Sequence, residues 1–158
     1  MPQPLRRIAV RPILTTVSCT IWLGRATRPY SFACPTGGSE FALLLVVGDS
    51  GVLPDEQACL SEQFVRAGCR HAVCFGPTSS TWDDSIDMVS VMDRVDGRAG
   101  PFVMTSWFDH DPLPEAVDFF ADCTSFDEWV PKHFVAFVLG GVPDLERDVH
   151  RALLARFR

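Results

Sequence analysis

The chain has one lysine among its fourteen basic residues and no acidic residue before Glu40. After that point the balance reverses, because residues 41–158 carry nine basic and nineteen acidic side chains, a net charge of −10. Binding to nucleic-acid phosphates needs a basic face, so this acidic body argues against a nucleic-acid partner. With 158 residues and 47% hydrophobic content, we expect one folded domain with a substantial core.

Several motifs that mark well-known chemistries are missing. The six cysteines form no C-x-x-C pair, which excludes a zinc knuckle and a thioredoxin-type site and favours free thiols. The chain has no P-loop, no G-x-G-x-x-G and no G-x-S-x-G. No complete catalytic constellation is present, so the sequence argues against an enzyme without deciding the matter.

The first forty residues are basic and contain only a short apolar stretch, Ile13 to Gly24. About 12 residues are too few to span a bilayer, so we expect no membrane span. We predict a poorly ordered basic N-terminal extension over residues 1–39, followed by a single α/β domain over 40–158. The alternatives for the extension are a strand or hairpin packed on the domain, and a targeting segment. Without targeting, the protein would be cytoplasmic.

Four apolar runs dominate the remaining chain. Each ends near Gly or Asp, and a helix-like pattern follows each of them. Since they are apolar throughout rather than alternating, they are typical of strands buried between two helix layers. The runs are FALLLVVGD (41–49), HAVCFGP (71–77), PFVMTSWFD (101–109) and HFVAFVLGG (133–141).

Helical periodicity fills the segments between these runs. We predict helices over Pro54–Ala67, from about residue 80 to Val95, over Pro112–Cys123, and over Pro143–Ala155. Strands alternating with helices indicate parallel pairing. The predicted fold is a small three-layer α/β sandwich with a mostly parallel sheet of four or five strands, in the flavodoxin-like order 2-1-3-4.

That fold directs attention to the carboxyl ends of the strands, where open parallel sheets bind ligands. In the order 2-1-3-4, the first and third strands would be neighbours and their ends would meet. The candidate ligand-binding residues at this edge are Asp49, Ser50, Gly51, Gly76, Thr78, Asp109, His110, Asp111 and Gly140, with Gly141 beside the last of them.

Three chemistries are open to these residues. Asp49, Asp109 and Asp111 are oxygen ligands suited to Mg²⁺, although Asp109 and Asp111 are equally suited to capping the helix that follows. The segment 76–81 offers hydroxyls and amides to a phosphate at a helix N-terminus. His110 is a candidate general base, and a solvated loop histidine is the alternative.

Three tryptophans, Trp82, Trp107 and Trp129, each lie within two residues of an acid. Exposed aromatic side chains beside acids are typical of interaction faces, and packing in the core is the alternative. We therefore treat these three as candidates for contact with another protein.

Three segments resemble a family of small uncharacterised bacterial domains. They are FGPTSSTWDDSIDM (75–88), TSWFDHDPLPEAVDFF (105–120) and FVAFVLGG (134–141). Together with the strand at 41–49, the resemblance covers about residues 40–141. It implies that the Trp-Asp-Asp and Ser-Trp-x-Asp stretches are the family's most recognisable parts and that the first forty residues lie outside it. It implies no function.

From the residues we expect a non-catalytic binding or protein-interaction module without a cofactor, as an accessory to a larger bacterial system. The alternative is a metal-assisted hydrolase or phosphotransfer enzyme that uses Mg²⁺ at the acidic strand ends. The sequence does not indicate the oligomeric state.

Overall fold

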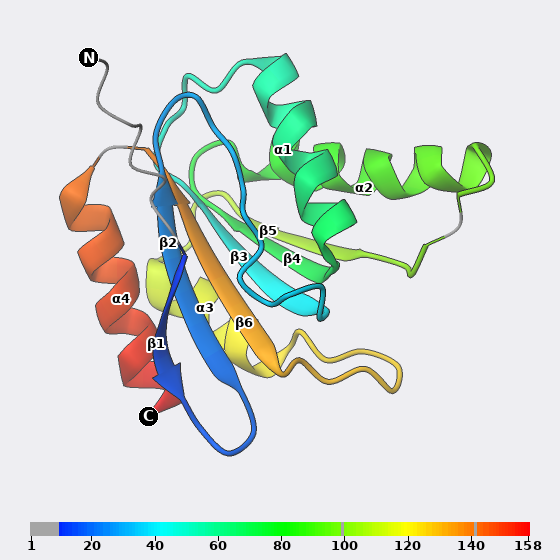
Figure 1. Ribbon diagram of the computed structural model, residues 1–158. Coiled ribbons are helices and arrows are strands. Elements are labelled where there is room, and N and C mark those ends of the chain that lie inside the picture. The colour runs from blue at the N-terminus through cyan, green and yellow to red at the C-terminus, as the bar shows by residue number, and fades with distance from the viewer. Residues whose placement is uncertain (1–9, 99, 141) are drawn as a thin grey trace, which may run out of the picture.

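The computed structural model describes residues 10–98, 100–140 and 142–158. It contains six strands and four helices in one α/β unit (Figure 1). In chain order these are β1 (Arg11–Thr15), β2 (Thr20–Ala26), β3 (Phe41–Val47), α1 (Pro54–Ala67), β4 (Cys69–Phe75), α2 (Ser79–Val95), β5 (Met104–Phe108), α3 (Leu113–Asp122), β6 (His133–Leu139) and α4 (Pro143–Phe157).

The strands form one sheet in the order β1-β2-β6-β3-β4-β5. Pairing is parallel throughout except between β1 and β2, which form an antiparallel hairpin. Helices α1 and α2 cover one face of the sheet, while α3 and α4 cover the other (Figure 1). Every residue of β3 is buried, as expected for a central strand between two helix layers. The predicted α/β class and mostly parallel sheet are confirmed.

The predicted strand order was wrong. The run at 133–141 forms β6, which lies beside β3, while β4 and β5 extend the sheet on the other side of β3. The two crossovers through α1 and α2 run over the same face, so the chain moves in one direction across the sheet, from β3 through β4 to β5. Helix α3 then crosses the opposite face and returns the chain to β3. Helical periodicity does not indicate which face of the sheet a helix covers. The strand order therefore could not be predicted from local sequence patterns.

The N-terminal region is part of the sheet rather than an extension beside it. Strand β2 pairs along its whole length with β6, and Ile21 and Leu23 are fully buried against the α3–α4 layer. The boundary predicted at residue 40 therefore lies inside the structural unit. Residues 11–26 form a hairpin packed on the domain, which was the alternative to an extension. The physical reason is that β6 would otherwise present an unpaired apolar edge to solvent. Residues 1–9 lie outside the described part.

The segment that joins β2 to β3 takes the place of a helix over β6. Its Phe32 side chain is buried among three other aromatic rings, with centroid distances of 5.0 Å to Phe64, 5.2 Å to Phe137 and 5.8 Å to Phe41. This packing anchors residues 27–40 across the α1 face. It also positions Arg28 and Tyr30 at the carboxyl end of the neighbouring strands.

Helix boundaries follow local chemistry closely. Helix α1 has the predicted bounds, with Pro54 at its start and Gly68 in the left-handed conformation (φ 112°) just past its end. Helix α2 begins at Ser79, one residue before the predicted start, and its N-cap Thr78 makes no side-chain cap hydrogen bond. Within the described ranges, no helix has both the length and the apolar character needed to cross a membrane.

Candidate functional site

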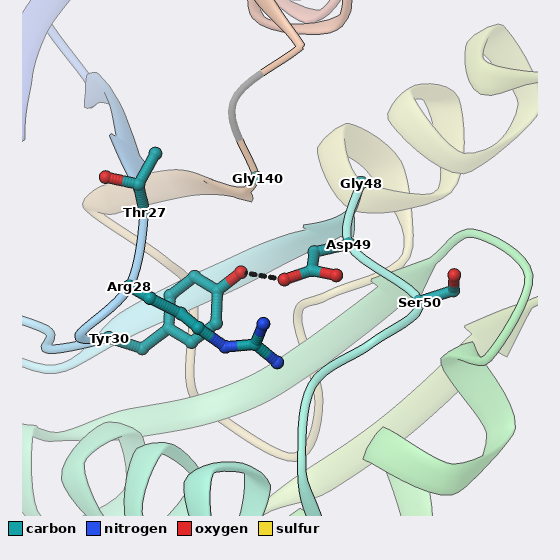
Figure 2. A pocket seen from close by; sticks show the side chains of 7 residues that line it. All are labelled: Thr27, Arg28, Tyr30, Gly48, Asp49, Ser50 and Gly140. Atoms are coloured by element: carbon teal, nitrogen blue, oxygen red, sulfur yellow. Dashed lines mark hydrogen bonds between the residues drawn. The ribbon is translucent and has the colours of Figure 1, made fainter.

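An open hollow lies at the carboxyl ends of β2, β3 and β6 (Figure 2). Its volume is about 420 Å³, and three chain segments contribute to it: the residues after β2, the turn after β3 and the first residue after β6. The lining residues are Thr27, Arg28, Tyr30, Gly48, Asp49, Ser50 and Gly140.

This position is the point where the strand order reverses. The chain leaves β3 toward β4 and β5 on one side, and β6 returns on the other side. Connections on either side of β3 and β6 therefore diverge, which leaves a crevice between their ends. The sequence predicted this crevice between the strands at 41–47 and 102–108. In the structure it lies between β3 and β6.

Two glycines allow the chain to pack closely at the floor of the hollow. The Gly48 amide donates to the Leu139 carbonyl at 2.8 Å, and a Cβ at Gly48 would lie 2.7 Å from that same oxygen. Gly140 has φ +119°, and a Cβ there would lie 3.1 Å from the Gly48 carbonyl carbon. Only residues without a side chain fit both positions, so backbone rather than side chains forms this floor.

Asp49 is the carboxylate at the centre of the hollow. The Tyr30 hydroxyl donates a hydrogen bond to Asp49 Oδ2, and the Gly51 amide donates to Oδ1 at 2.8 Å. Both bonds stabilise the charged form, so they hold the pKa of Asp49 below its ordinary value. Burial, together with the bond to Asp49, raises the pKa of Tyr30, which therefore stays protonated as a donor. Figure 2 shows the two side chains pointing toward each other across the hollow.

Arg28 lines the hollow and pairs with Glu56 of α1. Arg28 Nε lies 3.2 Å from both carboxylate oxygens of Glu56, and Arg28 Nη2 donates to the Gly51 carbonyl. Glu56 Oε1 also accepts the Leu53 amide at 3.0 Å at the start of α1. This bonding raises the pKa of Arg28 and lowers the pKa of Glu56, so both remain charged. Through these contacts Arg28 joins the segment after β2 to the turn after β3 and to the start of α1.

The predicted partners Asp49 and Asp109 follow strands that are not neighbours in the sheet. Strand β4 lies between β3 and β5, so their ends are two strand spacings apart, about 10 Å. In the structure the two carboxylates have different partners: Tyr30 and Gly51 bond to Asp49, whereas Ser79 and Ser80 bond to Asp109. Among the described residues, no three His, Cys, Asp or Glu side chains gather as metal ligands.

Asp109 instead caps α2. Its Oδ1 accepts the Ser79 hydroxyl at 2.6 Å and the Ser80 amide at 3.0 Å, and these bonds lower its pKa. A carboxylate therefore already occupies the helix N-terminus where the sequence suggested a phosphate. Gly76 and Thr78 belong to this turn, and Gly76 donates to the Phe108 carbonyl at 3.1 Å.

His110 and Asp111 are exposed on the turn after Asp109. Helix α3 begins at Leu113 with Pro112 as its N-cap and no side-chain cap, so the suggested capping role of Asp111 is not found. Of the nine predicted ligand-binding residues, the hollow contains three, Asp49, Ser50 and Gly140, with Gly51 just beside it. Gly141 lies outside the described residues.

The three tryptophans have different surroundings. Trp82 is only 1% exposed and packs in the core under α2, so it does not contribute to an interaction face. Trp129 is half-buried, with the Arg70 guanidinium 5.5 Å from its ring centroid. Trp107 is 55% exposed on the edge strand β5 and is the one tryptophan of the three with a free surface.

The sequence did not indicate Thr27, Arg28, Tyr30 and Glu56 as site residues. The first three lie in the region interpreted as an extension, and Glu56 lies in the first turn of a predicted helix. A usable signal was present: the apolar run around Ile21 and Leu23 ends just before Arg28, as the other apolar runs end before polar turns.

A family model matches residues 25–155, from β2 into α4 and thus most of the chain. Comparison with curated proteins and with solved structures finds no match. The family match confirms the resemblance to uncharacterised domains. It also starts before residue 40 and ends beyond residue 141, because β2 and α4 belong to the same sheet-and-helix unit. The chain therefore belongs to the family described as a domain of unknown function, DUF7684.

Proposed function

We propose that this protein is a non-catalytic binding module whose hollow at the ends of β2, β3 and β6 takes a small hydroxyl-bearing molecule. The observation that carries the proposal is the ionised Asp49 carboxylate, which two neighbouring donors hold at the reversal point of the sheet. Small-molecule sites in open α/β sheets occur at this point.

The hydrogen-bonding capacity of the hollow argues for the ligand class. A carboxylate has about four acceptor positions, and Tyr30 and Gly51 use two of those on Asp49. Arg28 also lines the hollow, and a guanidinium carries five N–H donors. A ligand that both donates and accepts at adjacent atoms, such as a sugar with neighbouring hydroxyls, matches an acceptor beside a donor.

The test is NMR titration of the full chain with a panel of monosaccharides and ribonucleosides. We expect shifts in the amides of Asp49, Ser50 and Gly140 and a rise in the unfolding midpoint with the ligand that binds. Asp49→Asn removes the charged acceptor and should weaken binding about tenfold or more, since hydrogen bonds to charged groups contribute roughly 1.5–3 kcal/mol. Asp118→Asn, an exposed change on α3, is the matched control.

The proposal fails if no compound of the panel shifts those amides, or if Asp49→Asn binds as the unaltered chain does. A cytoplasmic location is part of the proposal, supported by six cysteines that are all free thiols. Fractionation of the native host with an antibody to the chain would test that location.

A further inference from the structure

One side of α2 carries charges that form no ion pair within the described residues. Asp84, Asp87, Val91 and Arg94 follow one another at spacings of three and four residues, so they share one side of the helix, and Arg98 follows in the turn after it. All five are exposed. In the described part of the chain, none of the four charged members takes part in an ion pair. We call this set the α2 flank.

The order of charges along the α2 flank is self-complementary. Its first half is acidic, its centre is Val91, and its second half is basic. A second α2 flank running antiparallel, with the two-fold axis at Val91, places Asp87 opposite Arg94 and brings Asp84 toward the end that holds Arg98. Each pair then occurs twice, which is the property of an isologous interface. A different partner would need to reproduce this order by chance, so the α2 flank fits a second copy of this chain best.

The surroundings of the α2 flank extend the same surface. Met88, Met92 and Val95 add exposed apolar side chains next to it. The Arg94 guanidinium lies 5.2 Å from the Phe102 ring centroid, so the α2 flank faces the β5 side of the molecule. Strand β5 pairs only with β4 among the described strands, and Trp107 is exposed on it. An unpaired edge strand beside exposed apolar residues is a surface that native proteins normally cover.

The spacing of the sheet agrees with helix packing at this surface. Helix α2 lies over β4 and β5. If a two-fold axis runs beside β5, the two copies of α2 are separated by about two strand spacings, ~10 Å. Packed helices have axes 8–10 Å apart, so the helices make contact as the two β5 edges meet. We propose that the protein forms a symmetric homodimer through the α2 flank and the edge of β5. This proposal is independent of the ligand site.

Charge reversal tests the proposal with the full chain, using sedimentation velocity over a concentration series. The unaltered protein should show a dimer that weakens as salt rises. Asp87→Arg and Arg94→Asp should each weaken it about tenfold or more, since each change places two like-charged pairs across the axis. An equimolar mixture of the two variants should recover a dimer, because every Arg then faces an Asp. Arg147→Asp, an exposed change on α4, is the control and should leave the dimer unchanged.

Three results would overturn the proposal. The first is a monomer at all concentrations for the unaltered chain. The second is a dimer that neither reversal weakens, which would place the interface elsewhere. The third is a failure of the mixed variants to associate while each remains folded by circular dichroism, since the paired charges would then not face each other.

Discussion

At the scale of single residues, two adjacent aspartates of α2 differ in burial. Asp83 and Asp84 are adjacent residues near the start of α2. In the structure Asp84 is exposed, whereas Asp83 is only 9% exposed and faces β5. One carboxylate oxygen of Asp83, Oδ1, has no hydrogen-bond partner among the described residues. Burial raises the pKa of Asp83, and a hydrogen bond from Thr105 offsets part of that rise.

We expect Asp83→Asn to increase the free energy of unfolding by about 1 kcal/mol at neutral pH, because it removes a poorly solvated charge. A raised pKa in the folded state means that the wild-type chain loses stability as pH rises through that pKa. The gain should therefore be largest at neutral pH and disappear in acid, where Asp83 is already protonated. Urea unfolding at several pH values measures it, and a variant less stable than the wild type at pH 7 would contradict the explanation.

At the scale of elements, local patterns located the helices well and identified their caps poorly. Pro54 and Gly68 define α1 through contacts within a few residues, so periodicity and turn chemistry were sufficient. The cap of α2 comes from Asp109, thirty residues away along the chain. No local rule connects the two, because the contact exists only when the ends of β4 and β5 lie side by side.

This distant capping contact predicts different effects on stability for substitutions at Asp109 and Asp111. Asp109→Ala leaves the Ser79 hydroxyl and the Ser80 amide without their acceptor, so the unfolding midpoint should fall clearly. Asp111→Ala should leave the midpoint nearly unchanged, because Asp111 is exposed and does not cap α3. Thermal unfolding followed by circular dichroism compares them, and equal midpoints for the two variants would argue against the capping role.

At the scale of the whole molecule, the N-terminal hairpin completes the sheet. Strand β2 covers β6, and the segment after it brings Phe32 into the α1 layer and Arg28 and Tyr30 into the hollow. Basic composition suggested an extension because five arginines precede residue 40 without an acid. Arg11 and Arg25 instead pair with Glu146 of α4, and Arg28 pairs with Glu56 of α1.

Deletion of residues 1–39 should therefore prevent stable folding, because it uncovers β6 and removes the buried side chains Ile21, Leu23 and Phe32. The milder change Leu23→Ala should retain the fold and cost about 2–5 kcal/mol of unfolding free energy. Far-ultraviolet circular dichroism and urea unfolding measure both. A truncated chain that unfolds cooperatively with the stability of the full protein would show that the domain starts at residue 40.

The sequence by itself determined the α/β class, the buried character of the central strands and most helix boundaries. These features depend on patterns within about twenty residues, and such patterns can be recognised in the sequence alone. Only the tertiary structure decided the strand order and, with it, the location of the site. Asp49 and Asp109 both follow apolar strands, yet β4 separates them, while Tyr30 reaches Asp49 from a region of opposite charge. The reason is that strand order depends on which face each crossover helix covers, and that choice is made by packing between distant segments.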